Sequence, residues 1–309
     1  MFEERMLGET LKLLKRKKAR RVLIQVPEGL KTGVQRLANF LEKNGFETLI
    51  SIEPCFGACD LRDREAKALG CDTLLHLGHA SMDVKAEVPV VYYEYPIEYD
   101  FIPVVRIFLK QIKFRKICVV STVQFLNALE KAVKFMEENG FEVYNGGKIL
   151  GCDASGPKKH ENVTECFLFI GSGRFHPLGL QEKTDKPVLF LDIENRTLEN
   201  LLEEKNKMEI RRKLRIEKAR GMKSFGILVS TKPGQNKIRN AFDLKEKLKK
   251  TGRDVYILAG DYFTAEKLLG LKIDVLVNTS CPRIRDDYEQ FNKIIFNPED
   301  AEEMIAADE

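Results

Sequence analysis

The segment Asn44-Gly45-Phe46-Glu47 recurs as Asn139-Gly140-Phe141-Glu142, 95 residues further along a chain of 309 residues. At the same offset, the apolar run Val22-Leu23-Ile24-Gln25-Val26 falls on Ile117-Cys118-Val119-Val120-Ser121. A weaker third copy has its apolar run at residues 226–230. One matching tetrapeptide can arise by chance, but several features at a single offset indicate an internal repeat, which decides the fold.

Short apolar runs rich in Val, Ile and Phe recur in order within each third of the chain. Their continuous apolar character is typical of strands buried on both faces of a parallel sheet. Between them, apolar residues spaced three and four apart, as at Val34, Leu37 and Leu41, predict helices that end at glycines such as Gly45. Each third therefore reads as four strands alternating with three helices.

This pattern predicts an α/β fold of three similar doubly wound parallel-sheet domains arranged about a pseudo-threefold axis. The expected domains span residues 1–98, 99–196 and 197–309.

Composition excludes several classes of protein. The 51 Lys+Arg against 47 Asp+Glu leave a net charge of +4, which excludes a strongly basic nucleic-acid binder. No run of about 18 apolar residues could span a membrane. The acidic residues Glu3 and Glu4 stand where a secretory signal needs basic and then apolar residues. With seven cysteines, an odd number, we expect a cytoplasmic protein whose thiols are reduced or bound to metal.

The cysteines divide by their position relative to the predicted strands. Cys71, Cys118 and Cys166 lie at the start of apolar runs or inside them, as small core residues do. Three others follow the carboxyl end of a strand, one in each third of the chain: Cys59, Cys152 and Cys281. Ligands of parallel sheets bind at that edge. Three soft thiolates from three similar domains suit an iron–sulfur cluster with one open iron, although ordinary loop thiols would show the same spacing.

Two other metal motifs are disfavoured. Cys55 precedes Cys59 by four residues, but Arg62 stands where a CxxxCxxC motif would have its third cysteine. The usual radical S-adenosylmethionine loop is therefore absent. Zinc is a weak interpretation because the four histidines form no close-spaced ligand pair with a CxxC motif.

Further loops offer weaker candidates for substrate binding. The segment 171–179, which contains glycines and a histidine, follows a predicted strand. The turn at residues 27–30 likewise follows the first predicted strand. Each segment could contact a ligand or could simply lead into a helix. Two arginines near Cys281 could bind a carboxylate or could be ordinary surface residues. The candidates are Glu28, Gly29, Gly171, Gly173, His176, Arg283 and Arg285. The basic stretches 12–21 and 205–223 are either solvated helix faces or docking surfaces.

Taken together, these motifs make the sequence similar to the archaeal diphthamide synthase family, the 2-(3-amino-3-carboxypropyl)histidine synthases. The resemblance covers essentially the whole chain. It is carried by the motifs Val26-Pro27-Glu28-Gly29-Leu30, Gly57-Ala58-Cys59-Asp60, Leu150-Gly151-Cys152, Gly171-Ser172-Gly173-Arg174-Phe175-His176-Pro177-Leu178-Gly179 and Ser280-Cys281-Pro282-Arg283. The resemblance implies a 4Fe–4S cluster held by Cys59, Cys152 and Cys281, without Cys55, in a homodimer.

The resemblance also implies the reaction. S-adenosylmethionine binds the open iron, an electron donor reduces the cluster, and the bond from sulfur to the methionine γ-carbon breaks. The resulting 3-amino-3-carboxypropyl radical adds to the imidazole C2 of a histidine in translation elongation factor 2, and methylthioadenosine is released. On this interpretation, no catalytic side chain is needed beyond the cluster. Neither a membrane nor a nucleic acid is expected as a partner.

Two alternatives stay open. Quinolinate synthase looks like another triplicated fold in which an open iron acts as a Lewis acid without radicals. A scaffold of three flavodoxin-like units, stabilised by metal but without catalysis, is the non-enzymatic alternative.

Overall fold

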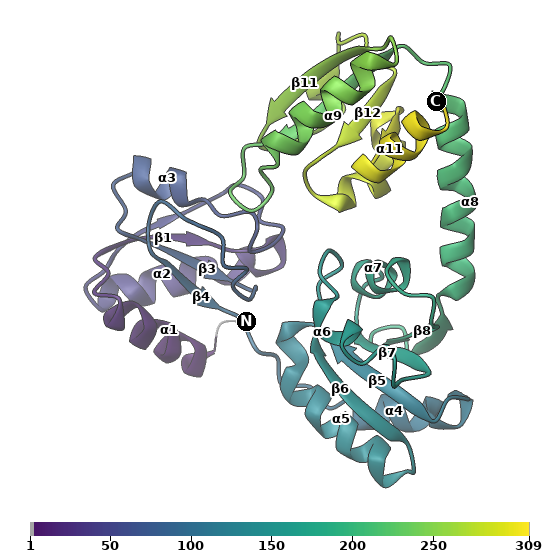
Figure 1. Ribbon diagram of the computed structural model, residues 1–309. Helices are drawn as coiled ribbons and strands as arrows, with labels where there is room; N and C mark the ends of the chain where they lie inside the picture. The colour runs from purple at the N-terminus through teal and green to yellow at the C-terminus, as the bar shows by residue number, and fades with distance from the viewer. Residues whose placement is uncertain (1–2, 309) are drawn as a thin grey trace. The chain divides into compact units, whose positions relative to one another are not determined.

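The computed structural model describes residues 3–308, and the side chains of residues 285–289 fall outside that description. It contains three sheets whose strands run mainly parallel, with helices packed against them (Figure 1). The predicted α/β class with three repeated sheets is confirmed. The described residues up to Tyr95 and those from Lys213 onward form one compact unit, and Pro96–Arg212 form a second. The three domain boundaries and the pseudo-threefold arrangement stay predictions.

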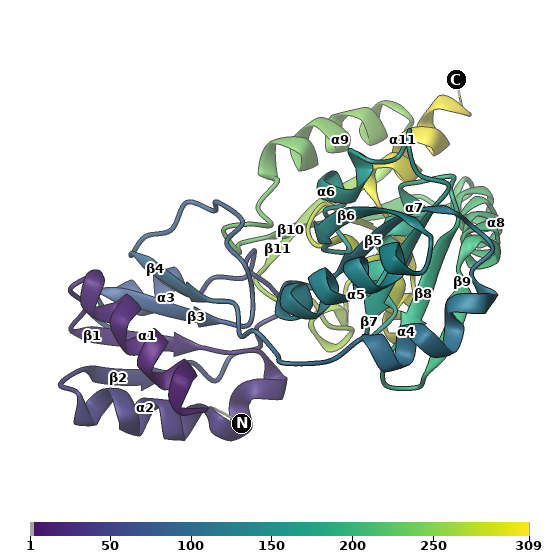
Figure 2. The same cartoon turned by 90° about the horizontal axis from the view of Figure 1, so that it is seen from below.

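All three sheets share one strand order, in which the first strand of each repeat lies between its second and third strands. The first sheet contains β1 (Arg21–Gln25), β2 (Glu47–Ile50), β3 (Thr73–Leu77) and β4 (Val90–Tyr93). The second contains β5 (Lys116–Ser121), β6 (Glu142–Lys148), β7 (Cys166–Gly171), β8 (Val188–Asp192) and β9 (Thr197–Asn200). The third contains β10 (Ser224–Ser230), β11 (Asp254–Gly260), β12 (Val275–Asn278) and β13 (Ile294–Phe296). The sequence did not predict β9, which pairs antiparallel with β8 at the sheet edge (Figure 2).

The repeat extends to the register of the strands. Arg21 pairs with Glu47 in the first sheet, and Lys116 pairs with Glu142 in the second, so the offset of 95 residues is kept by both partners. The repeated Asn-Gly turn explains why. Gly45 and Gly140 take φ values of +88° and +86°, which end the preceding helices in the left-handed region that glycine adopts without strain.

Helices cover both faces of each sheet, as Figures 1 and 2 show for the first one. The helices of the first two repeats are α1 (Glu4–Arg16), α2 (Val34–Lys43), α3 (Asp63–Ala68), α4 (Ile102–Phe108), α5 (Leu126–Glu138), α6 (Ser155–Lys158) and α7 (Phe175–Glu182). The remaining α-helices are α8 (Leu202–Ala219), α9 (Ile238–Lys250), α10 (Tyr288–Phe291) and α11 (Pro298–Ala306). The 3₁₀ turns are η1 (Glu28–Gly33), η2 (Leu109–Gln111), η3 (Val123–Phe125), η4 (Glu266–Leu268) and η5 (Pro282–Asp287).

Alternate residues of each central strand pack into different cores. In β1, Val22 and Ile24 join the core that includes α1 and α2, whereas Leu23 joins the core on the face of α3. Burial on both faces is what the continuous apolar runs predicted. The prediction that Cys71, Cys118 and Cys166 are core residues is confirmed, since all three are buried.

The helix content differs from the prediction in one respect. A helix was expected between the third and fourth strands of each repeat, but the described segment 78–89 between β3 and β4 contains none. The segment begins at Gly78, with φ +83°, where an added Cβ would lie 2.9 Å from the Pro27 ring. The chain thus turns sharply against the loop after β1 at the point where a helix would have to start. Among the described residues, no helix has both the length and the apolar character needed to cross a membrane.

Candidate functional site

The loop that carries Cys59 follows β2 and is held by a loop from the third sheet. Cys59 lies in a turn, half-buried, with Asp60 beside it. The loop after β10 contacts this turn: the Gly234 amide donates to the Cys59 carbonyl oxygen at 3.1 Å, and Gln235 Nε2 donates to Cys59 Sγ at 3.2 Å. A Cβ at Gly234 would lie 2.5 Å from the Cys59 Cα, so only glycine allows this approach.

A buried ion pair strengthens the same contact. Lys232 Nζ lies 2.7 Å from Asp60 Oδ2, and their side chains are only 4% and 0% exposed. The Lys232 ammonium also lies 5.2 Å from the centre of the Phe56 ring and 5.9 Å from that of Tyr262, and these two rings stack on each other. The carboxylate and the two aromatic ring faces together stabilise the buried ammonium.

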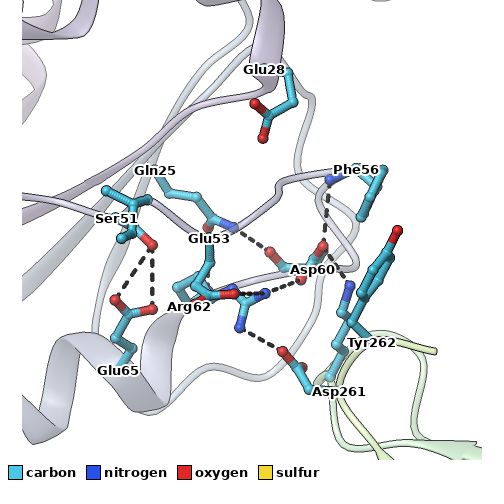
Figure 3. Close-up of polar contacts among 12 residues, drawn as sticks. Gln25, Glu28, Ser51, Glu53, Phe56, Asp60, Arg62, Glu65, Asp261 and Tyr262 are labelled. Atoms are coloured by element: carbon cyan, nitrogen blue, oxygen red, sulfur yellow. Dashed lines mark hydrogen bonds and ion pairs between the residues drawn. The ribbon is translucent and has the colours of Figure 1, made fainter. Parts of the chain in front are cut away.

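Arg62 makes a second link between the first and third sheets (Figure 3). Its guanidinium lies 2.6 Å from Asp261 Oδ2 and 3.8 Å from Asp60 Oδ1. The two basic groups that face Asp60 therefore come from different loops. Together, these contacts fix the backbone on both sides of Cys59.

Behind this loop, the end of β1 supplies a buried amide. Gln25 Nε2 donates to the Asp60 carbonyl oxygen at 2.5 Å, and Gln25 Oε1 accepts from the Arg62 amide at 3.2 Å (Figure 3 shows the first of these bonds). His76, in β3, lies with Nδ1 3.0 Å from the same Gln25 Oε1.

Two histidines and a cysteine meet here, which the sequence did not indicate. His76 Nε2 lies 3.0 Å from His79 Nδ1, and the ligand atoms of Cys55, His76 and His79 all lie within 4.8 Å of one another. Burial lowers the pKa of His76 to about 3, with a further contribution from His79, and lowers that of His79 to about 4. Burial, and then the charge of Asp60, raises the pKa of Cys55 to about 12. The sequence feature that could have indicated this group is the pair His76 and His79, three residues apart at the carboxyl end of a predicted strand.

Cys281 lies at the corresponding edge of the third sheet, after β12. It is half-buried, and its carbonyl oxygen accepts from Asn278 Nδ2 at 2.7 Å. The next turn, η5, carries Arg283, which is exposed, and Arg285, whose side chain lies outside the described residues.

The loop of Cys152 belongs to the other unit and follows β6. Leu150 and Asp153 exchange two backbone hydrogen bonds of 3.1 Å each, which places the exposed Cys152 at the tip of a tight turn. Behind the turn lies α7. A Cβ at Gly179 would come within 2.2 Å of the Gly151 carbonyl oxygen, so two glycines allow the helix and the turn to touch.

The glycine- and histidine-containing segment thus supports the Cys152 loop. His176, one of the predicted substrate-binding residues, accepts a hydrogen bond at Nδ1 from the Gly151 amide at 3.1 Å. Gly171 ends β7 and is buried, and the exposed Gly173 takes φ +75° in the turn into α7.

The remaining candidates lie in the turn after β1. Glu28 is exposed, forms an ion pair of 2.6 Å with Lys31, and stands apart from the Asp60 contacts in Figure 3. Gly29 is exposed, with open space where a Cβ would stand.

Of the predicted cysteine loops, the structure brings that of Cys59 together with the loop after β10. The convergence of Cys59, Cys152 and Cys281 on one centre stays a prediction.

Comparison with known proteins gives a consistent result. The family described as "Putative diphthamide synthesis protein" matches residues 26–309. The 2-(3-amino-3-carboxypropyl)histidine synthase of Pyrococcus horikoshii is 38% identical, over 99% of this chain and 91% of the relative. The protein of the same name from Methanocaldococcus jannaschii is 29% identical over 91% of this chain and 83% of its own. The crystal structure of Dph2 from Pyrococcus horikoshii with 4Fe-4S cluster superposes with a TM-score of 0.90 at 38% identity, covering 97% of this chain and 90% of that chain.

Proposed function

Because the chain belongs to the diphthamide synthesis family and is a transferase, we propose that it transfers the 3-amino-3-carboxypropyl group of S-adenosylmethionine to a histidine of translation elongation factor 2. The acceptor atom is the imidazole C2. The observation that carries the proposal is the 38% identity, over nearly the whole chain, to a synthase named for the modified histidine that results.

The cofactor of the proposed reaction is a 4Fe–4S cluster with Cys59, Cys152 and Cys281 as its ligands. When bound, the cluster supplies the single electron that cleaves the bond from sulfur to the methionine γ-carbon. The donor set fits the group, because thiolates are the ligands that iron–sulfur clusters take. A relative with a TM-score of 0.90 was solved with this type of cluster.

The surroundings of Cys59 also fit a cluster ligand. The Gln235 amide donates to Cys59 Sγ, and N–H donors to ligand sulfur favour the charged thiolate over the thiol. The buried Lys232–Asp60 pair holds the adjacent backbone, so the sulfur is presented from a rigid turn. For Cys152, the contact between Gly151 and Gly179 has the same role.

Substrate positioning is assigned to the polar groups beside these loops. Arg283 is exposed next to Cys281, where a guanidinium could pair with the carboxylate of S-adenosylmethionine. Arg285, Glu28, Gly29, Gly171, Gly173 and His176 complete the proposed substrate-binding set. The protein would act as a homodimer in the cytoplasm and take its electron from a separate donor.

Mass spectrometry of the protein substrate tests this function. The anaerobically reconstituted chain, dithionite and S-adenosylmethionine should add one 3-amino-3-carboxypropyl group to a single histidine of elongation factor 2. Cys59→Ala should abolish the addition, whereas Cys71→Ala, which alters a buried core thiol, should retain it. An unmodified factor with the fully loaded protein would contradict the proposal.

A further inference from the structure

Three side chains that commonly bind metal ions meet at the carboxyl end of the first sheet, outside the set proposed for the cluster. Cys55 comes from the loop after β2, His76 from β3, and His79 from the turn that follows β3. Cys55 and His76 are buried and His79 is half-buried. Their ligand atoms lie within 4.8 Å of one another.

The hydrogen bonds around Gln25 determine which nitrogen of His76 faces this group. Gln25 Nε2 donates to a carbonyl oxygen, that of Asp60, and Gln25 Oε1 accepts from a backbone amide, that of Arg62. The orientation of the carboxamide follows from these two backbone partners. An amide oxygen can only accept, so His76 Nδ1, at 3.0 Å, must carry the proton.

His76 Nε2 is then left with its lone pair directed at His79. His79 Nδ1, at 3.0 Å, donates to it in the metal-free arrangement. A histidine whose Nδ1–H is held by a fixed oxygen while Nε2 faces outward is the usual arrangement of a metal ligand, in which the outer partner orients the ring. Gln25 has the position of that outer partner.

The distances suit a small tetrahedral ion. With metal–nitrogen bonds of about 2.0 Å and metal–sulfur bonds of about 2.3 Å, tetrahedral geometry separates two nitrogens by about 3.3 Å and nitrogen from sulfur by about 3.5 Å. His76 Nε2 and His79 Nδ1 are now 3.0 Å apart, and the Cys55 sulfur lies within 4.8 Å of one nitrogen of each ring. Small side-chain movements would convert one arrangement into the other.

We propose that Cys55, His76 and His79 bind a divalent transition-metal ion, with Zn²⁺ as the ion that this donor set fits best. One thiolate and two neutral imidazoles complete three of four tetrahedral positions and leave the fourth to water or another ligand. On binding, the Cys55 thiol gives its proton to solvent, and the His79 proton moves from Nδ1 to Nε2. One proton is therefore released for each ion bound, and no electron is transferred.

The ion would tie the segment before Cys59 to the end of β3. Cys55 precedes Cys59 by four residues, and Asp60 is already held to Gln25, which also holds His76. The site uses no side chain of the proposed cluster. It stands or falls independently of the proposed function.

Metal analysis of the full chain tests the site. After cluster reconstitution, exposure to Zn²⁺ and desalting, the wild-type chain should retain about one Zn²⁺ ion. Cys55→Ala and His79→Gln should each lose the ion, whereas Cys71→Ala, a buried thiol of the same repeat, should keep it. Equal zinc content in Cys55→Ala and the wild type would overturn the proposal.

Cobalt distinguishes this site from the cluster ligands. In a Cys59→Ala/Cys152→Ala/Cys281→Ala chain, Co²⁺ should give the thiolate charge-transfer absorption and the strong visible bands of tetrahedral coordination. Adding Cys55→Ala should remove the charge-transfer absorption. Its absence from the triple variant, with the fold intact by circular dichroism, would overturn the site. If the wild type bound Zn²⁺ through Cys55 but no iron, the metal site would stand and the proposed function would fail.

Discussion

The loops of Cys59 and Cys152 occupy equivalent places in two repeats, yet they are held in different ways. The turn of Cys59 is half-buried and tied by side chains: a buried ion pair from Lys232 to Asp60 and an amide from Gln235. The turn of Cys152 is exposed and contains no buried ion pair among the described residues: glycines of the turn and of α7 are in direct contact, and the His176 and Lys183 side chains hydrogen-bond to the Gly151 backbone. The repeat thus preserves where a thiol stands at the sheet edge, while each copy has its own means of fixing it.

The largest effect should come from the thiols themselves. Cys59→Ala, Cys152→Ala and Cys281→Ala should each reduce the iron content from about four atoms per chain to near zero, because each removes one of three protein ligands. Iron and sulfide analysis after anaerobic reconstitution measures this. Cys71→Ala is the matched control and should keep its iron. Equal iron loss in all four variants would contradict the assignment.

Breaking the ion pair should destabilise the Cys59 loop more than any other single contact. Lys232→Met removes the nearer of the two cations that face the fully buried Asp60 carboxylate and leaves only Arg62, at 3.8 Å, so it should lower the free energy of unfolding by about 3–5 kcal/mol. Urea unfolding followed by circular dichroism gives the value. The double variant Asp60→Asn/Lys232→Met should recover a large part of the loss, because no unpaired charge remains. A loss in Lys232→Met below about 1 kcal/mol, the range of exposed pairs, would show that the pair does not hold this loop.

The Cys152 loop should respond to steric change instead. Gly179→Ala places a Cβ 2.2 Å from the Gly151 carbonyl oxygen and should cost about 1–3 kcal/mol while weakening cluster retention. The control is Gly8→Ala in α1, where nothing lies within 4 Å of the added Cβ; it should stabilise the chain by about 0.5–1 kcal/mol. Similar stability and iron retention in both variants would refute the backbone contact as the support of Cys152.

The smallest effect concerns the sulfur of Cys59. Gln235→Leu removes an N–H donor to Sγ. The whole bond is worth about 1 kcal/mol, so at 59 mV per 1.4 kcal/mol its preference for the reduced cluster can lower the potential by at most about 40 mV when the donor is removed. The direction follows because the donor stabilises the more negative, reduced cluster. A redox titration followed by electron paramagnetic resonance measures the shift, with Cys71→Ala, a buried core thiol, as control. An unchanged potential would mean that the amide does not contact the sulfur when the cluster is bound.

Local sequence predicted the repeated features well. The Asn-Gly turns at residues 44–45 and 139–140 end equivalent helices at glycines of positive φ, and they set the same register in two sheets. Burial of Cys71, Cys118 and Cys166 followed from their place in apolar runs. Such features depend on neighbours within a few residues, and periodicity reveals them.

The features that sequence could not predict depend on distant partners. Lys232 and Gln235 contact the Cys59 turn across 172 and 176 residues, and no spacing rule links those positions. Cys55, His76 and His79 match no zinc motif of the sequence, because such motifs are built on a CxxC pair and the chain has none. In the fold, β3 lies beside β1, and the histidines at the end of β3 therefore lie near the loop of Cys55, which stands more than 15 residues earlier in the chain. Proximity of this kind is a property of strand order, which becomes visible only once the sheet has formed.

The most direct measurement is the fate of S-adenosylmethionine on the reduced protein. The anaerobically reconstituted chain, mixed with dithionite and S-adenosylmethionine in a single turnover, should release methylthioadenosine, identified by chromatography and mass spectrometry. Cys152→Ala should release none. Formation of 5′-deoxyadenosine would contradict the proposed bond cleavage, and no cleavage at all by the cluster-loaded protein would favour a Lewis-acid dehydratase or a scaffold over the radical transferase.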